Sequence, residues 1–221
     1  MTTETRFRHR TEAGQLLASR LTQYANRPNV IVLGFPRGGV VVAFEVAKAL
    51  NVTLDICLVR NLGVPGHAEL SMGAISVDGL QVLNDDAIAW LRISGHTIAE
   101  VADLELKELQ RRDRVYRGDR PPPQIHDQAV ILVDDGLATG SMMRAAIGVL
   151  KPQQPRRIVI AVPVAPLKIC NELRSEVDEV VCLITPASFD AIGLWYEKFD
   201  CITDPEVCEL LAKISVASTA T

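Results

Sequence analysis

Two adjacent carboxylates, Asp134 and Asp135, directly follow four apolar residues in the stretch VILVDDGLATGS, residues 130–141. Neighbouring residues of a strand point to opposite faces, so the two acids cannot perform the same task in the same place. Carboxylates at a strand end suit sugar hydroxyls or a hydrated Mg²⁺. The small and hydroxyl residues that follow, among them Thr139 and Ser141, let backbone amides approach a phosphate at the start of a helix. These residue types predict a sugar-phosphate site.

Other signatures of phosphate and acyl chemistry are missing from the sequence. It contains no Gly-x-x-x-x-Gly-Lys-Ser/Thr loop, no Gly-x-Gly-x-x-Gly stretch and no Gly-x-Ser-x-Gly elbow, which argues against a P-loop nucleotidase, a dinucleotide-binding domain and an α/β-hydrolase. The plain structural alternative is a capped turn between a strand and a helix. Capping explains one aspartate, but not two followed by Thr-Gly-Ser.

The stretch 130–141 resembles the 5-phosphoribosyl-1-pyrophosphate (PRPP) motif of type I phosphoribosyltransferases, in which apolar residues precede two acids, a spacer, Thr-Gly and a hydroxyl residue. The resemblance implies that Asp134 and Asp135 contact the ribose hydroxyls and that residues 137–141 cradle the 5′-phosphate. The implied PRPP-binding residues are Asp134, Asp135, Gly136, Leu137, Ala138, Thr139, Gly140 and Ser141.

A second stretch, GFPRGGVVVA at residues 34–43, resembles the pyrophosphate loop of the same family. The resemblance implies a loop of Pro36, Arg37, Gly38 and Gly39, in which the guanidinium and the backbone amides hold the diphosphate. A Pro-Arg-Gly-Gly sequence is also often only a turn. Its position after the first strand of the same sheet favours the pyrophosphate loop.

The family also carries a mobile loop and a C-terminal hood. The mobile loop corresponds to residues 60–79, where Arg60 is a catalytic candidate and His67 and Glu69 are candidates for acid–base work, although a lone His beside Gly and Pro is commonly just exposed. The hood begins at residue 186 and would bind the acceptor. Three of its aromatic residues could stack on a base or simply pack the tail onto the sheet, namely Trp195, Tyr196 and Phe199.

The implied reaction is the displacement of pyrophosphate from C1 of PRPP by a nitrogen acceptor, a nucleobase, in nucleotide metabolism. The implied catalytic residues are Asp134, Asp135, Arg37 and Arg60. Mg²⁺ is the implied cofactor; PRPP holds it in the main, and the two aspartates contact it indirectly. We expect these aspartates to act by positioning and electrostatics rather than by proton transfer.

Two positions depart from the family pattern. Ala138 stands where the 6-oxopurine enzymes usually carry an Asp, which favours an acceptor of the adenine or uracil type. Asn61 follows Arg60, at a position where many relatives have a lysine. Without that ammonium group, we expect weaker binding of pyrophosphate and a lower catalytic rate. Two other functions therefore stay open: a sensor that binds PRPP or a nucleotide without turnover, and a sugar-phosphate hydrolase.

The elements that must position these residues alternate along the chain. Apolar strands are expected at 29–35, 53–60, 129–135, 156–164 and 178–185, and helices at 11–25, 38–50, 141–151 and 166–176. Between them we expect a loop at 62–70, a hairpin at 73–84 that turns at Asp78-Gly79, and a long charged helix at 96–117. A last helix lies in the tail.

This alternation predicts an α/β fold: a mostly parallel twisted sheet flanked by helices, with ligands bound outside the C-terminal strand ends. Three motifs fall at such ends, GFPRGG, VRN and VDDGLATGS. We expect one domain over residues 1–221, with a core at about 28–185, an insertion at about 61–122 that holds the mobile loop and helices, and a hood at about 186–203.

Composition restricts the class of protein. Of 221 residues 48% are hydrophobic, and the net charge of −4 argues against nucleic acid as the main partner. The N-terminus lacks the apolar segment of a signal peptide, and the longest apolar run is too short for a membrane span. The cysteines form no Cys-x-x-Cys pair, so we expect reduced thiols in a cytoplasmic protein. A homodimer is the default assembly.

Overall fold

The computed structural model describes residues 6–217, without the side chains of Ala68, Glu69 and residues 215–217. The chain divides into two compact units. The first consists of Met1–Cys57, Pro123–Gly140 and Pro155–Thr221, and the second of Leu58–Pro122 and Ser141–Gln154. The expected single-domain organisation stays a prediction.

The first unit is built on a five-stranded sheet with the order β2-β1-β6-β7-β8, in which every pair of neighbours is parallel. The strands are β1 (Val30–Gly34), β2 (Thr53–Ile56), β6 (Ala129–Val133), β7 (Arg157–Val164) and β8 (Glu179–Ile184). Both β1 and β6 are buried along their whole length, as continuous apolar runs require when both faces of a sheet are covered. The expected parallel α/β fold is confirmed.

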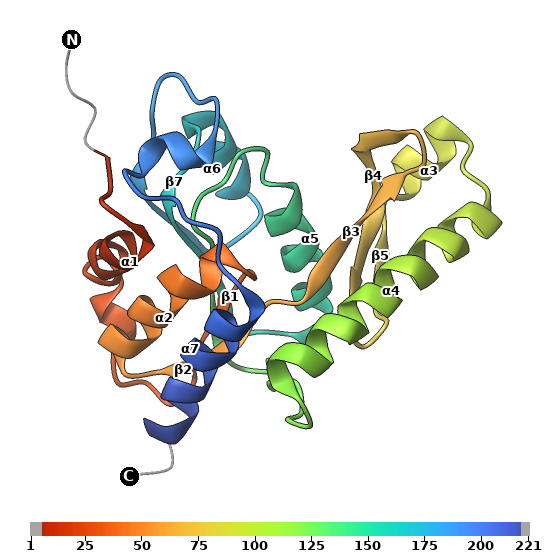
Figure 1. Ribbon diagram of the computed structural model, residues 1–221. Coiled ribbons are helices and arrows are strands. Elements are labelled where there is room, and N and C mark those ends of the chain that lie inside the picture. The colour runs from red at the N-terminus through yellow and green to blue at the C-terminus, as the bar shows by residue number, and fades with distance from the viewer. Residues whose placement is uncertain (1–5, 218–221) are drawn as a thin grey trace. The chain divides into compact units, whose positions relative to one another are not determined.

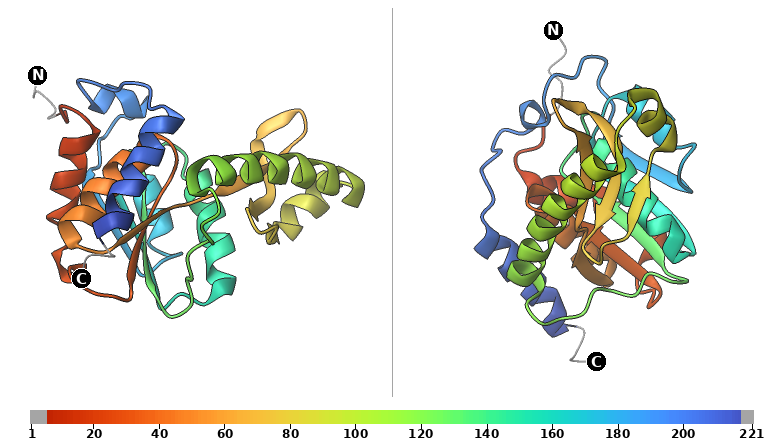
Figure 2. Two further views of the ribbon diagram at one scale, coloured as in Figure 1. Left: turned by 60° about the horizontal axis from the view of Figure 1, so that its bottom comes forward. Right: turned by 90° about the vertical axis from the view of Figure 1, so that its right-hand side faces the viewer.

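Helices cover this sheet (Figure 1). They are α1 (Arg10–Ala18), η1 (Thr22–Tyr24), α2 (Gly38–Leu50), α6 (Leu167–Leu173), η3 (Ile192–Trp195) and α7 (Asp204–Ala217). Figure 2 shows α1, α2 and α7 grouped together, and α2 contacts both of the other two. The start of α7 is stabilised by a capping box, since Thr203 N donates to Glu206 Oε2 at 2.7 Å and Glu206 N donates to Thr203 Oγ1 at 3.4 Å.

The direction of the connections reverses between β1 and β6. From β1 the chain passes through α2 to β2 on one side, whereas β7 and β8 follow β6 on the other side. Because parallel crossovers are right-handed, α2 and α6 belong to opposite faces of the sheet. Ligands of open α/β sheets bind at such a reversal, outside the carboxyl ends of the two strands between which it occurs.

The second unit is a three-stranded antiparallel sheet with helices around it. Its elements are β3 (Val59–Val64), β4 (His67–Ser76), β5 (Gln81–Leu83), α3 (Asp85–Leu91), α4 (Gly95–Arg117), α5 (Ser141–Leu150) and η2 (Lys151–Gln153). The expected turn at Asp78-Gly79 joins β4 to β5, and Gly79 adopts φ +84° there. The hairpin of 73–84 is confirmed.

Two sequence predictions for this region were wrong. The apolar run 53–60 is not one strand, because the chain leaves the parallel sheet after Ile56 and enters the antiparallel sheet at Val59. The expected loop of 62–70 is instead the junction of β3 and β4, with Pro65 and Gly66 in a tight turn. Gly66 adopts φ +81°, a conformation that glycine tolerates, so the Pro-Gly pair marks a two-residue turn rather than a long loop.

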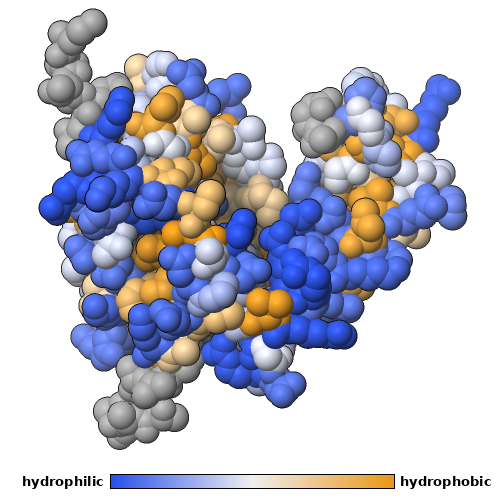
Figure 3. All heavy atoms as spheres, in the orientation of Figure 1, coloured by the Kyte–Doolittle hydropathy of each residue, from blue (hydrophilic) through white to orange (hydrophobic). Residues whose placement is uncertain are grey.

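The long helix α4 packs on this sheet along one thin stripe. Ala102, Leu109 and Tyr116, seven residues apart, are its buried apolar residues. The outward side is mainly hydrophilic in Figure 3, with Leu104 as an exposed exception. None of the described helices is both long and apolar enough to cross a membrane. The five cysteines, all among the described residues, form no disulfide, and Cys57 and Cys170 are buried.

Candidate functional site

The two motifs of the first unit meet where β1 and β6 end. Gly38 and Gly39 open α2 after β1, while Asp134 and Asp135 follow β6. A Cβ atom on Gly39 would lie 2.7 Å from Asp134 Oδ1, and one on Gly38 would collide with Asp135 Oδ2. Only glycine allows this approach of backbone to carboxylates. The predicted neighbourhood of the GFPRGG and VDDGLATGS stretches is therefore present in the fold.

Arg37 occupies the entrance of α2. It is the N-cap residue of that helix and its side chain is exposed. The Pro36–Arg37 peptide bond is cis. The first backbone amides of a helix of this length carry partial positive charge, which favours an anion beside them. A guanidinium and helix amides thus lie on the same loop as the two glycines.

Asp135 is held from two directions. The side chain is largely buried, and its Oδ2 accepts a hydrogen bond from Arg10 Nε at 2.7 Å in an ion pair. Its backbone carbonyl accepts a hydrogen bond from the Tyr196 hydroxyl at 2.6 Å. Both partners come from the ends of the chain, so neither was identified as a motif neighbour from the sequence.

The N-terminal segment and the hood pair with each other and carry Arg10 to this place. Phe7 N donates to Trp195 O at 2.9 Å, and Glu197 N donates to Phe7 O at 2.8 Å. Nothing in the residue pattern distinguishes Arg10 from the other arginines of the N-terminal segment. Only the pairing of segments about 190 positions apart places it beside the motif.

Asp134 differs from its neighbour in its surroundings. It is half-buried, and its Oδ1 accepts a hydrogen bond from Asp135 N at 2.8 Å. Burial raises the pKa of the Asp134 carboxyl well above the usual 3.8, and the negative charge of Asp135 raises it further. The pair therefore divides its roles: Asp134 favours the protonated form, while the cation Arg10 pairs with Asp135.

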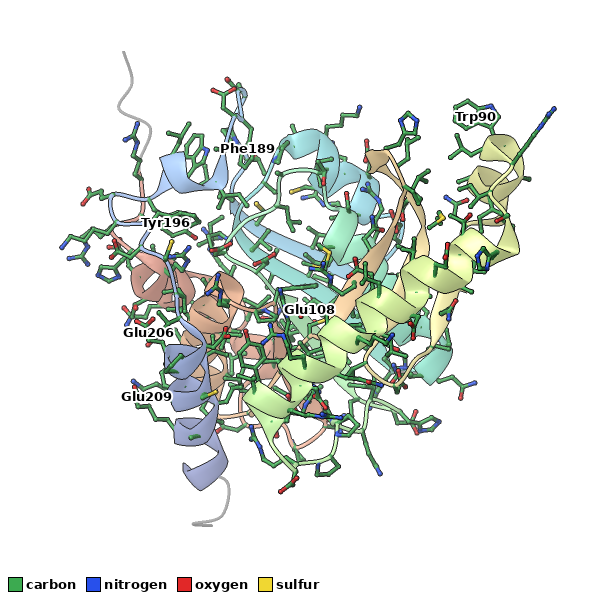
Figure 4. All side chains as sticks on the ribbon, turned by 45° about the vertical axis from the view of Figure 1, so that its right-hand side comes forward. Trp90, Glu108, Phe189, Tyr196, Glu206 and Glu209 are labelled. Carbon is green, nitrogen blue, oxygen red and sulfur yellow. The ribbon has the colours of Figure 1, made fainter. Side chains whose placement is uncertain are left out.

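The hood packs directly on the motif. A Cβ atom on Gly136 would lie 2.7 Å from a side-chain carbon of Ile192, so glycine is needed under η3. Trp195 and Tyr196 are buried beside Phe7 in one apolar cluster, and Figure 4 shows Tyr196 on the segment after η3. These two rings therefore pack the tail onto the first unit, which was the alternative to stacking on a base.

Phe199 is partly exposed, but its ring contacts two other side chains. Its exposed fraction is 38%. The Arg10 guanidinium carbon lies 3.8 Å from the ring centroid, and the Tyr196 ring lies 5.1 Å away from centroid to centroid. One face of Phe199 is thus covered by a cation, so this face is not open to a stacked base.

The predicted phosphate loop runs from the first unit into α5. Leu137 is buried, and its backbone N donates to Val164 O at 2.9 Å. Ala138 and Thr139 are exposed, and Gly140 adopts φ +74°, a conformation that glycine tolerates. Ser141 is the first residue of α5. Exposed small residues around a glycine of positive φ fit the predicted approach of backbone amides to a phosphate.

The mobile-loop candidates lie on the hairpin of the second unit. Arg60 is in β3 rather than at the end of a parallel strand, and its Nε pairs with Glu105 Oε2 of α4 at 2.6 Å. Asn61 points to the opposite face, where it accepts a hydrogen bond from the Ser71 hydroxyl. His67 is exposed at the start of β4, and the side chain of Glu69 lies outside the described residues. The prediction that VRN ends a parallel strand was wrong.

Mg²⁺ stays a predicted cofactor, and the donors at this strand end would contact it through a bound ligand. Among the described residues no three His, Cys, Asp or Glu side chains are placed to hold a metal ion. Asp134 and Asp135 each use one oxygen within the protein. Their other oxygens suit hydrogen bonds from the water shell of a magnesium ion bound to a phosphorylated sugar. The donor set agrees with an indirect contact.

Comparison with known proteins gives a consistent result. The model of the phosphoribosyl transferase domain family matches residues 9–194. Two curated proteins from Mycobacterium tuberculosis, strains CDC 1551 and H37Rv, are 43% identical over 205 residues, or 93% of this chain, and are provisionally described as phosphoribosyl transferases. The match covers 46% of each, so the chain spans about half the length of these relatives.

A solved structure extends the comparison. The crystal structure of TT1426 from Thermus thermophilus is 41% identical in sequence and superposes with a TM-score of 0.85. The match covers 94% of this chain and 98% of that chain. At this identity and coverage, the similarity extends to nearly the whole of both chains.

Proposed function

The chain belongs to the phosphoribosyl transferase domain family, and on that premise we propose that it transfers the 5-phosphoribosyl group of PRPP to a nitrogen acceptor and releases pyrophosphate. One observation carries the proposal. Gly38 and Gly39 touch the carboxylates of Asp135 and Asp134, so an anion loop and two sugar-binding acids share one strand edge. PRPP has a ribose and a diphosphate joined at C1, which is the pair of groups that this edge could hold.

Each part of the edge has a role in the proposed reaction. The acceptor nitrogen forms a bond to C1 as the bond from C1 to the diphosphate oxygen breaks, and pyrophosphate leaves with that electron pair. Arg37 and the first amides of α2 stabilise the leaving charge. Mg²⁺, bound mainly to PRPP, supplies further positive charge on the diphosphate.

The carboxylates act on the ribose. Asp135, held by Arg10, places its carboxylate beside a ribose ring that becomes positive as the bond to C1 breaks. Asp134 offers its oxygens to the ribose hydroxyls. Proton removal from the acceptor nitrogen is not assigned to either acid, because both are engaged in hydrogen bonds at the strand end.

A nucleobase is the proposed acceptor. Ala138 is exposed beside the phosphate loop and brings no carboxylate, so a 6-oxopurine gains no acidic partner from this position. Adenine- and uracil-type bases are therefore placed first in the acceptor panel below. Of the three predicted stacking residues Phe199 is the most exposed, at 38%, and it is the one that we propose contacts the base.

Two observations favour a sensor as the second candidate. Arg10 occupies one oxygen of Asp135, and Glu105 holds Arg60 in an ion pair at 2.6 Å. Charges that are already paired within the protein stabilise the charges that develop on the ribose and on the leaving group less than unpaired charges do. A sensor would bind PRPP or a nucleotide by the same edge and would not turn it over.

One experiment separates these functions. The protein is incubated with PRPP, Mg²⁺ and a panel of nucleobases and small amines, and pyrophosphate is followed. Release that depends on an acceptor supports the transferase; release without one indicates a hydrolase; PRPP binding without release indicates a sensor. Asp134→Asn and Asp135→Asn should each reduce turnover more than threefold, and smaller losses contradict the assignment of both acids.

The remaining partners are also proposals. We propose small-molecule substrates in the cytoplasm, without nucleic acid or membrane as partners, and a homodimer as the assembly. The net charge of −4 is the support for excluding nucleic acid. Sedimentation of the purified chain, with and without PRPP, measures the assembly directly.

A further inference from the structure

We infer that Arg10 is a positioning residue for PRPP, which holds Asp135 in the orientation that receives the ribose and ties this acid to the hood. The inference rests on the proposed function and deepens it, because it adds a residue outside both motifs to the site. Arg10 would act through Asp135 rather than on the reacting atoms.

Arg10 touches three separate parts of the site. Its Nε bonds to Asp135 Oδ2 at 2.7 Å, and its Nη1 donates to Asp200 O of the hood at 2.8 Å. Its guanidinium lies over the Phe199 ring. It also borders the pyrophosphate loop, since a Cβ on Gly38 would lie 2.8 Å from its Nε. Together these contacts fix a guanidinium whose residue is only 8% exposed.

Stability alone does not account for such an arrangement. Removing two charges from water is costly, and a well-packed apolar pair in place of a buried ion pair is often equally or more stabilising. The geometry instead gives a definite result: Arg10 Nε engages Oδ2 of Asp135 and fixes the orientation of the carboxylate, and Oδ1 is the oxygen that Arg10 does not contact. A carboxylate that is already oriented loses less conformational freedom when the ligand binds.

The test uses Arg10→Gln, Arg10→Lys and the double variant Arg10→Gln/Asp135→Asn. Arg8→Gln is the matched control, because Arg8 Nε pairs with Glu12 at the same 2.7 Å, but its side chain is 69% exposed. Titration calorimetry with PRPP and Mg²⁺ reports the dissociation constant and the fraction of competent protein, and thermal melts report stability. No acceptor is needed.

The wild type should bind PRPP, and Arg10→Gln should bind it roughly 10- to 100-fold more weakly with an unchanged competent fraction. Arg10→Lys should be intermediate, because an ammonium keeps the charge but not the planar contacts. The double variant should regain thermal stability, since no unpaired carboxylate is left, but not affinity. Arg8→Gln should stay within about twofold of the wild type, as expected for an exposed ion pair.

Two results overturn the inference while leaving the proposed function intact. One is an Arg10→Gln affinity within about twofold of the wild type, well below the loss expected for a hydrogen bond to a charged group. The other is a smaller competent fraction with an unchanged dissociation constant, which is the signature of a purely structural role. If the wild type itself does not bind PRPP, the proposed function fails, and the inference that rests on it fails with it.

Discussion

Asp134→Asn tests the protonation of the acid pair through stability. Burial and the charge of Asp135 raise the pKa of Asp134 in the folded protein above the usual 3.8. Between that value and the raised pKa, the folded protein holds a proton that the unfolded chain has lost. The free energy of unfolding of the wild type should therefore fall as pH rises through this interval, because ionisation favours the unfolded state.

The size of this pH dependence follows from the difference of one bound proton between the folded and unfolded states. A difference of one bound proton changes the free energy of unfolding by about 1.4 kcal/mol per pH unit. Asn cannot ionise, yet its Oδ1 can still accept the hydrogen bond from Asp135 N that measures 2.8 Å in the wild type. The stability of the variant relative to the wild type should thus increase by up to about 1.4 kcal/mol per pH unit above about pH 4, and level off beyond the raised pKa.

Tryptophan fluorescence can isolate the relevant unit. The chain has two tryptophans. Trp195 is buried in the first unit with Asp134, whereas Trp90 is 77% exposed on α3 and projects outward in Figure 4. In a Trp90→Phe background, urea unfolding followed by Trp195 between about pH 4 and about pH 8 reports the site. Asp190→Asn is the control, because Asp190 is exposed.

A constant stability difference between Asp134→Asn and its background across this pH range would refute the reasoning, since it would mean that Asp134 ionises alike in the folded and unfolded states. A difference that grows in favour of the wild type would refute it more strongly, because the carboxylate would then be stabilised by folding.

Gly38→Ala should lower the free energy of unfolding by about 2–5 kcal/mol in urea titrations, because its Cβ would collide with Asp135 and press on the buried ion pair. Gly63→Ala is the control: its Cβ would have no atom within 4 Å, so the free energy of unfolding should change by no more than about 0.5 kcal/mol. Tyr196→Phe should destabilise the protein by about 1–3 kcal/mol in the same assay, since the carbonyl of Asp135 loses its donor; a loss under about 0.5 kcal/mol would mean that water replaces the hydroxyl.

The parallel sheet was predictable because its signal is local. β1 and β6 are short, apolar and rich in β-branched residues, and such runs form strands whose two faces are covered. Helices separate these strands along the sequence, so the sheet had to be parallel. The residue types at the ends of the two strands predict a sugar-phosphate site by themselves, without knowledge of the strand order.

Strands β3 and β4 of the second unit were predicted less well, because the local sequence does not mark where β3 begins or how far the two strands extend. The apolar run 53–60 has no glycine or proline at Cys57 and Leu58, where the chain changes from one sheet to the other. The Pro65-Gly66 pair indicates a turn, but the length of the strands on each side depends on pairing between β3 and β4. Strand pairing is a property of two segments and is weakly encoded in either one.

The sequence by itself determined the chemistry: two acids after one strand and an Arg-Gly-Gly loop after another. The tertiary structure alone decided which groups surround them. Strand order made β1 and β6 neighbours, and pairing of the N-terminal segment with the hood brought Arg10 to Asp135. Local residue patterns record which side chains a strand end presents, whereas the partner of a buried charge depends on contacts between distant segments, which no local pattern specifies.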